Sequence, residues 1–63
     1  MEKLKQLRID CNYSCNDMAK RLSISTPFYW QLENEKRVLT YLMALKIASI
    51  FNLRPDDIFY KEK

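Results

Sequence analysis

Residues 14–34, SCNDMAKRLSISTPFYWQLEN, decide the fold of this chain. Their apolar residues recur at three- and four-residue spacing within each half of the segment, which predicts two short helices that each bury one face. These residues are Met18, Ala19 and Leu22 in the first half, Ile24 at the centre, and Tyr29 and Leu32 in the second half. The segment therefore predicts two helices that meet at a tight corner and share one core, which leaves their other faces to a partner.

Signals for helix starts divide the rest of the chain. Ser14, Ser25 and Thr40 offer hydroxyl N-caps. Pro27 and Pro55 suit the first turn of a helix, where a missing N–H costs nothing. The sequence predicts five helices: residues 2–10, a second after Ser14, a third to about Glu33, a fourth from Thr40 to Asn52, and a short fifth starting at residues 54–57. Lys61, Glu62 and Lys63 are expected to fray.

The chain contains no glycine, the residue that most often ends a helix in the left-handed conformation. Asparagine is its commonest substitute, because its short polar side chain tolerates a positive φ. Asn12, Asn34 and Asn52 each follow a predicted helix. We therefore expect these three residues to adopt the left-handed conformation.

The fourth predicted helix carries the broadest apolar stripe, so we expect it to supply most of the core. The stripe consists of Tyr41, Ala44, Leu45, Ile47, Ala48 and Phe51. The five helices together account for the chain. The sequence thus predicts an all-α fold.

Composition argues against several classes of function. The 63 residues include no histidine and two cysteines, which excludes a Cys/His zinc site and argues against an enzyme, a metal, a cofactor or a small-molecule substrate. Cys11 and Cys15 are separated by three residues, without the surrounding strand pattern of a thioredoxin-like redox pair. We therefore expect two reduced thiols, buried or half-buried, rather than a redox pair.

Charge and hydropathy bear on partners and location. Eleven Lys and Arg against eight Asp and Glu give a net charge of +3, which permits nucleic-acid binding without requiring it. No apolar run approaches the roughly 18 residues that span a bilayer, and residues 1–8 lack a signal-peptide core. We expect a cytoplasmic protein with no membrane partner.

The order and spacing of several segments resemble a known family. They are LKQLR at residues 4–8, Ser14, MAKRL at 18–22, Ser25, LENEK at 32–36 and LKIASIFNL at 45–53. In these residues the chain resembles the phage-repressor and Cro-type (XRE-like) helix-turn-helix family. The resemblance implies one compact five-helix repressor-like domain over residues 1–63 that binds double-stranded operator DNA, with the third helix in the major groove.

The resemblance also implies roles for individual residues. Base edges are expected to meet Thr26, Pro27, Phe28 and Gln31, of which Gln31 suits adenine and Thr26 suits thymine. The DNA backbone is expected to meet Ser14, Cys15, Asn16, Ser25, Trp30, Lys36 and Arg37, although Lys36 and Arg37 can also be an ordinary solvated pair. Arg8 and Glu33 match an ion pair between the first and third helices, which we interpret as structural.

Four positions depart from the family pattern. Ser23 and Glu35 replace glycines, Leu39 replaces a proline and Cys15 replaces a glutamine. The loop before the fourth helix is therefore expected to follow a different path. Phe28, Tyr29 and Trp30 are also three consecutive aromatic residues, of which only Tyr29 is expected to point into the core. The other two can meet DNA, meet a protein, or fold over the edge of the core.

Two functions follow from these patterns. The first is a small sequence-specific transcriptional regulator, a repressor that occupies an operator as a homodimer. Its predicted dimer face consists of Phe51, Leu53, Ile58, Phe59 and Tyr60, which exceed the needs of so small a core. The second is a protein-interaction module of the same fold, such as an antirepressor or antitoxin-like protein, that uses the aromatic third helix.

Overall fold

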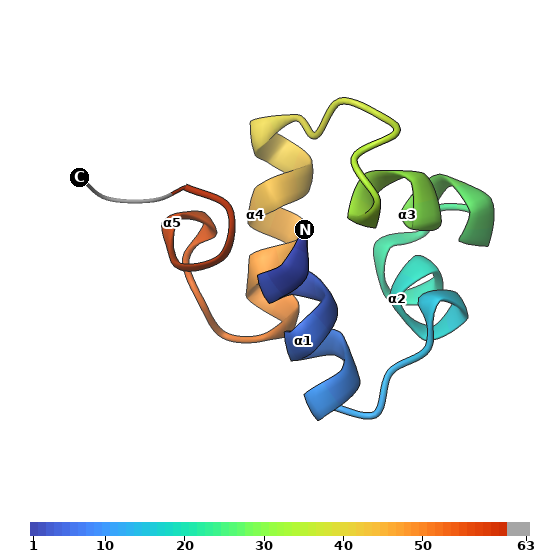
Figure 1. Ribbon diagram of the computed structural model, residues 1–63, viewed down its shortest axis with the longest axis horizontal. Coiled ribbons are helices and arrows are strands. Elements are labelled where there is room, and N and C mark those ends of the chain that lie inside the picture. The colour runs from blue at the N-terminus through green and yellow to red at the C-terminus, as the bar shows by residue number, and fades with distance from the viewer. Residues whose placement is uncertain (61–63) are drawn as a thin grey trace.

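Five α-helices make up the regular structure of residues 1–60, which are the residues described by the computed structural model (Figure 1). The helices are α1 (Glu2–Asp10), α2 (Cys15–Leu22), α3 (Thr26–Glu33), α4 (Tyr41–Ile50) and α5 (Pro55–Ile58). No strand occurs in this range, so the predicted all-α fold is confirmed. The expected fraying of Lys61, Glu62 and Lys63 lies outside the described residues.

The three predicted hydroxyl caps all begin helices. At the start of α2, the Ser14 Oγ accepts a hydrogen bond from the Asp17 N–H at 3.0 Å, and the Ser14 N–H donates to the Asp17 carboxylate at 2.8 Å. The bond donated by the Ser14 N–H holds the pKa of Asp17 below its usual value, because it favours the charged carboxylate. Ser25 and Thr40 cap α3 and α4 through the backbone N–H three residues ahead.

Within residues 1–60, four residues adopt the left-handed conformation: Asn12, Ser23, Glu35 and Asn52. The prediction is confirmed for Asn12 and Asn52 but is wrong for Asn34, which has a φ of −97°. The side chain of Asn34 instead donates from Nδ2 to the carbonyl of Trp30 at 2.9 Å. Glu35 takes the positive φ, 59°, and so adopts the conformation that a glycine favours at this point.

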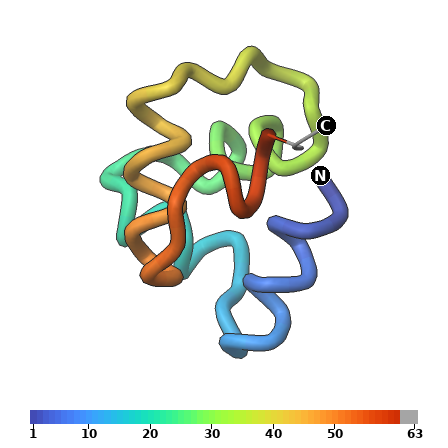
Figure 2. Tube along the Cα trace, turned by 90° about the vertical axis from the view of Figure 1, so that its left-hand side faces the viewer, coloured from blue at the N-terminus to red at the C-terminus, as the bar shows by residue number. Residues whose placement is uncertain are grey.

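The core lies where α1, α2, α3 and α4 meet. Its central cluster consists of Leu4, Met18, Ala19, Leu22, Tyr29 and Ile47. In Figure 1, α4 stands between the α2–α3 pair and α5, and Figure 2 shows the chain of α5 crossing in front of α4. The core therefore packs against one face of α3, the face that carries Tyr29.

The face that α4 buries is narrower than predicted. Ala44, Ile47 and Ala48 are buried, whereas Tyr41 and Leu45 are 59% and 41% exposed, so the expectation that these two join the core is wrong. Ala44, Ile47 and Ala48 lie on the face of α4 that packs against the core. Tyr41 and Leu45 lie on the adjacent stripe of the helix, which this packing leaves exposed. The outer side of α4 is consequently apolar.

Candidate nucleic-acid interface

The corner between α2 and α3 sets the direction of α3. Ser23 ends α2 in the left-handed conformation, with φ 59° and ψ 42°, and Ile24 donates its N–H to the carbonyl of Ala19 at 3.0 Å. Ser25 then begins α3 after only one further residue. The two helices pack directly on each other, which is the arrangement of a helix-turn-helix unit.

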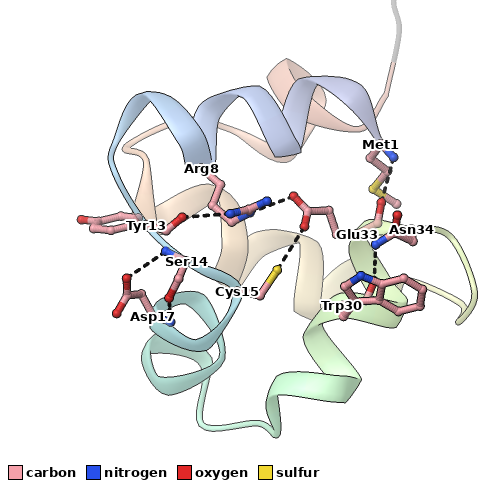
Figure 3. A network of polar contacts seen from close by, with 9 residues as sticks. All are labelled: Met1, Arg8, Tyr13, Ser14, Cys15, Asp17, Trp30, Glu33 and Asn34. Atoms are coloured by element: carbon pink, nitrogen blue, oxygen red, sulfur yellow. Dashed lines mark hydrogen bonds and ion pairs between the residues drawn. The ribbon is translucent and has the colours of Figure 1, made fainter.

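A polar network between the helices joins α3 to α1 and α2 (Figure 3). Arg8 donates from Nε to Oε1 of Glu33 at 3.0 Å and from Nη1 to the carbonyl of Tyr13 at 2.9 Å. Glu33 is only 4% exposed, so loss of Arg8 would leave its carboxyl group buried without this partner. The Arg8–Glu33 pair thus has the form of a structural ion pair that joins the first and third helices.

Cys15 belongs to the same network. Its thiol lies 3.6 Å from Oε2 of Glu33, and Figure 3 shows the sulfur turned toward this carboxylate. Burial raises the pKa of the Cys15 thiol and the Glu33 charge adds to the effect, so the thiol stays protonated and donates. The Cys15 side chain, which the resemblance places beside the DNA backbone, therefore points inward instead.

The two cysteines differ in burial. Cys15 is half-buried, as the sequence predicts, whereas Cys11 is exposed at the end of α1. The expectation of a buried or half-buried thiol is therefore wrong for Cys11. The reason is that Cys11 follows the last turn of α1, where the chain leaves the core.

The two faces of α3 carry different residues. Tyr29, Leu32 and Glu33 are buried, which confirms that Tyr29 alone of the three aromatic residues enters the core. Away from this buried face, Trp30 is 49% exposed, Pro27 is exposed one turn before it, and Gln31 is half-buried beside them. Pro27, Trp30 and Gln31 therefore line the outward face of α3, where a partner can meet them.

Five of the residues predicted to contact DNA form two side-chain clusters. In the first, Thr26 donates from Oγ1 to Oδ1 of Asn16 at 2.9 Å, which joins the first turns of α2 and α3. In the second, Arg37 donates from Nε to Oε1 of Gln31 at 2.9 Å, and its guanidinium carbon lies 4.7 Å from the centre of the Phe28 ring. Predicted base-reading residues are thus joined to predicted backbone-binding residues.

Sequence reasoning did not foresee these pairings. Arg37 lies six residues after Gln31 and beyond the end of α3, so no helical spacing links the two. The chain returns because Glu35 turns it with a positive φ and the Lys36 N–H donates to the carbonyl of Gln31 at 2.8 Å. The only sequence signal for this turn was the Asn34–Glu35 pair after α3, because a left-handed residue at that point redirects the loop.

The predicted dimer residues divide into two groups. Phe51, Ile58 and Phe59 are half-buried and pack against the core of the same chain. Leu53 and Tyr60 are exposed, by 36% and 43%. The aromatic rings of Tyr60 and Tyr41 lie 6.3 Å apart, so Tyr60 adjoins the start of the outer face of α4.

Two further observations concern the described residues 1–60. Their helices include none with the length and apolar character needed to cross a membrane. The same residues bring together no group of three or more histidine, cysteine, aspartate or glutamate side chains suited to hold a metal ion.

Comparison with known proteins agrees with this geometry. The sequence matches a family model described as a helix-turn-helix domain, and the match covers residues 1–63. Comparisons with curated proteins and with solved structures give no significant match. The matched range includes the α2–corner–α3 unit and the helices that support it. The chain therefore belongs to the helix-turn-helix domain family.

Proposed function

We propose that this protein is a small sequence-specific transcriptional regulator of the Cro and phage-repressor type, which represses by occupying an operator in the cytoplasm. The observation that carries the proposal is the division of α3 into two faces. Its inner face is fixed by Tyr29, Leu32 and Glu33, and its outer face presents Pro27, Trp30 and Gln31. A helix held in this way can enter a major groove without rearrangement of the core.

Backbone contacts would come from both ends of this surface. The N–H groups of Cys15 and Asn16 open α2 and are not used by the Ser14 cap, which serves Asp17. Lys36 and Arg37 are exposed at the opposite end, just after α3. Phosphates held at both ends would set the register of α3 in the groove, and base edges would then meet the side chains between them.

A salt series tests the proposal. Binding of random-sequence duplex, followed by fluorescence anisotropy, should weaken steeply as salt rises, because each neutralised phosphate releases counterions. Lys36→Ala should reduce the slope of log affinity against log salt by about 1. Gln31→Ala should instead leave the slope unchanged and reduce the preference for a selected site. A protein that ignores all duplexes at low salt would refute the proposal.

A second candidate function rests on Trp30. An indole that is 49% exposed on an otherwise well-packed helix is typical of an anchor in a protein interface. The same fold could then bind another protein, as an antirepressor or antitoxin-like module would. Such an interface responds little to salt, so the salt series separates the two candidates. Trp30→Ala would weaken a protein complex more than Gln31→Ala would.

The proposed regulator acts as a homodimer on a two-fold symmetric site. Of the predicted dimer residues, Leu53 and Tyr60 are exposed, and Tyr60 adjoins an apolar stripe on the outer side of α4. This stripe consists of Tyr41, Leu42 and Leu45. We therefore place the self-association surface on this side of the molecule. Sedimentation equilibrium should show a dimer, and Leu42→Glu should convert it to a monomer. A wild-type protein that stays monomeric at hundreds of micromolar would contradict the proposed dimer.

A further inference from the structure

The amide of Gln31 is held in one orientation by Arg37. The contact joins Arg37 Nε to Gln31 Oε1 over 2.9 Å. A guanidinium carries only hydrogen-bond donors, so the amide atom that it meets must be the oxygen. The opposite orientation would place the NH₂ donors of Gln31 against the donors of Arg37. The pairing therefore leaves the NH₂ group of Gln31 as the part of the amide that can donate to another partner.

Arg37 is itself positioned by two further contacts. The face of its guanidinium lies over the half-buried Phe28 ring, 4.7 Å from the ring centre. The backbone bond from the Lys36 N–H to the Gln31 carbonyl, 2.8 Å long, brings the loop back alongside α3 directly before Arg37. Phe28, Gln31 and Arg37 thus form one preorganised unit, in which the ring supports the cation and the cation orients the amide.

The orientation changes which base the unit can read. A free glutamine pairs with adenine in the major groove by accepting from N6 with its oxygen and donating to N7 with its NH₂ group. In this unit one lone pair of Gln31 Oε1 already accepts from Arg37, and the guanidinium donors beside it disfavour the approach of a further amino group. Guanine presents two acceptors in the major groove, O6 and N7, and no donor. Donors alone therefore fit guanine better than adenine.

We infer that Phe28, Gln31 and Arg37 form a unit that presents mainly hydrogen-bond donors and selects guanine at one position of each half-site. The inference rests on the proposed DNA-binding function and specifies which base α3 reads there. Arg37 is in this respect a positioning residue for Gln31 as well as a cation beside the DNA. Its loss should change the base preference and not only the affinity.

Selection of bound fragments from random duplexes tests the inference. The wild-type protein should enrich guanine at one position of each half-site, and Gln31→Ala should abolish the preference at that position. Arg37→Ala frees the Gln31 oxygen and should shift the same position toward adenine, with a change of roughly tenfold in the ratio of guanine to adenine affinities. Lys36→Ala is the matched control: it removes a neighbouring positive charge, and should weaken all sequences equally.

Base analogues at the selected position give a second readout. Inosine keeps O6 and N7 and should bind as guanine does, whereas 7-deazaguanine lacks the N7 acceptor and should bind more weakly. Adenine enriched by the wild-type protein at the Gln31-dependent position would overturn the inference. A uniform loss of affinity in Arg37→Ala, as in Lys36→Ala, would also overturn it, because it would identify Arg37 as a phosphate contact only. Absence of any duplex binding would instead refute the proposed function on which the inference rests.

Discussion

The inner and outer faces of α3 are built by different means. The inner face is fixed by burial, with Tyr29 and Leu32 in the core and Glu33 paired to Arg8. The outer face is ordered by exposed and half-buried contacts, among them the bond from Arg37 to Gln31. Folding therefore depends on one face of this short helix, and the proposed recognition of DNA depends on the other. Changes to the inner face should cost stability, whereas changes to the outer face should alter binding.

The Arg8–Glu33 pair gives the largest expected effect. Arg8→Ala leaves the Glu33 carboxylate buried and unpaired, and should lower the free energy of unfolding by about 3 to 5 kcal/mol. For a domain of this size that loss can abolish folding. Urea denaturation followed by circular dichroism measures it. The double variant Arg8→Met with Glu33→Leu should recover much of the lost stability, because both charges are then absent. A loss below about 1 kcal/mol in Arg8→Ala would instead mean that the pair behaves as a surface ion pair.

The cap at the start of α3 should give an intermediate effect on stability. Ser25→Ala removes the acceptor for the Phe28 N–H and should cost about 1 kcal/mol of stability. Ser49→Ala is a matched control, since Ser49 is exposed near the end of α4 and caps no helix start. It should change stability by less than about 0.5 kcal/mol. Equal effects of the two substitutions in thermal unfolding would contradict the assigned role of Ser25.

The left-handed conformation of Ser23, in the corner before α3, slightly lowers the stability of the domain. Ser23 has a φ of 59°, which glycine adopts without penalty, so Ser23→Gly should stabilise the domain by up to about 1 kcal/mol. Ser49→Gly places the same residue within α4 and should destabilise it by roughly 0.5 to 1 kcal/mol. Opposite signs in one denaturation series would confirm the left-handed corner. A destabilised Ser23→Gly variant would show that the corner does not need a positive φ.

The outer face should give the smallest effect on stability. Trp30→Ala removes a side chain that is already half exposed, and should change the free energy of unfolding by less than about 0.5 kcal/mol while weakening partner binding. Calorimetric unfolding and a binding titration on the same sample measure both quantities. A large loss of stability would mean that Trp30 belongs to the core and that the two faces are not separate.

The sequence predicted the buried residues of the inner face of α3 but not the side-chain contacts of its outer face. Helical spacing placed Tyr29 and Leu32, and hydroxyl caps placed the starts of α2, α3 and α4, because both signals are local. The error at Asn34 arose because its side chain hydrogen-bonds to Trp30, so the left-handed turn moved to the next residue. Residue type alone does not reveal that exchange.

Two other features depended on contacts between distant segments. The bond from Arg37 to Gln31 forms only after the loop turns back, so no periodic pattern predicts it. The exposure of Tyr41 and Leu45 depends on how α4 is rotated against its neighbours, and an apolar stripe wider than the buried face leaves this rotation undetermined.

The most direct measurement of the central claim is an NMR titration of the protein with duplex DNA at low ionic strength. The account predicts that backbone amide shifts concentrate in residues 26–31, in residues 36–37 and at the start of α2, while the buried core of α4 changes little. Shifts confined to α4 and α5, or no shifts with any duplex, would contradict the claim that the outer face of α3 is the surface that meets DNA.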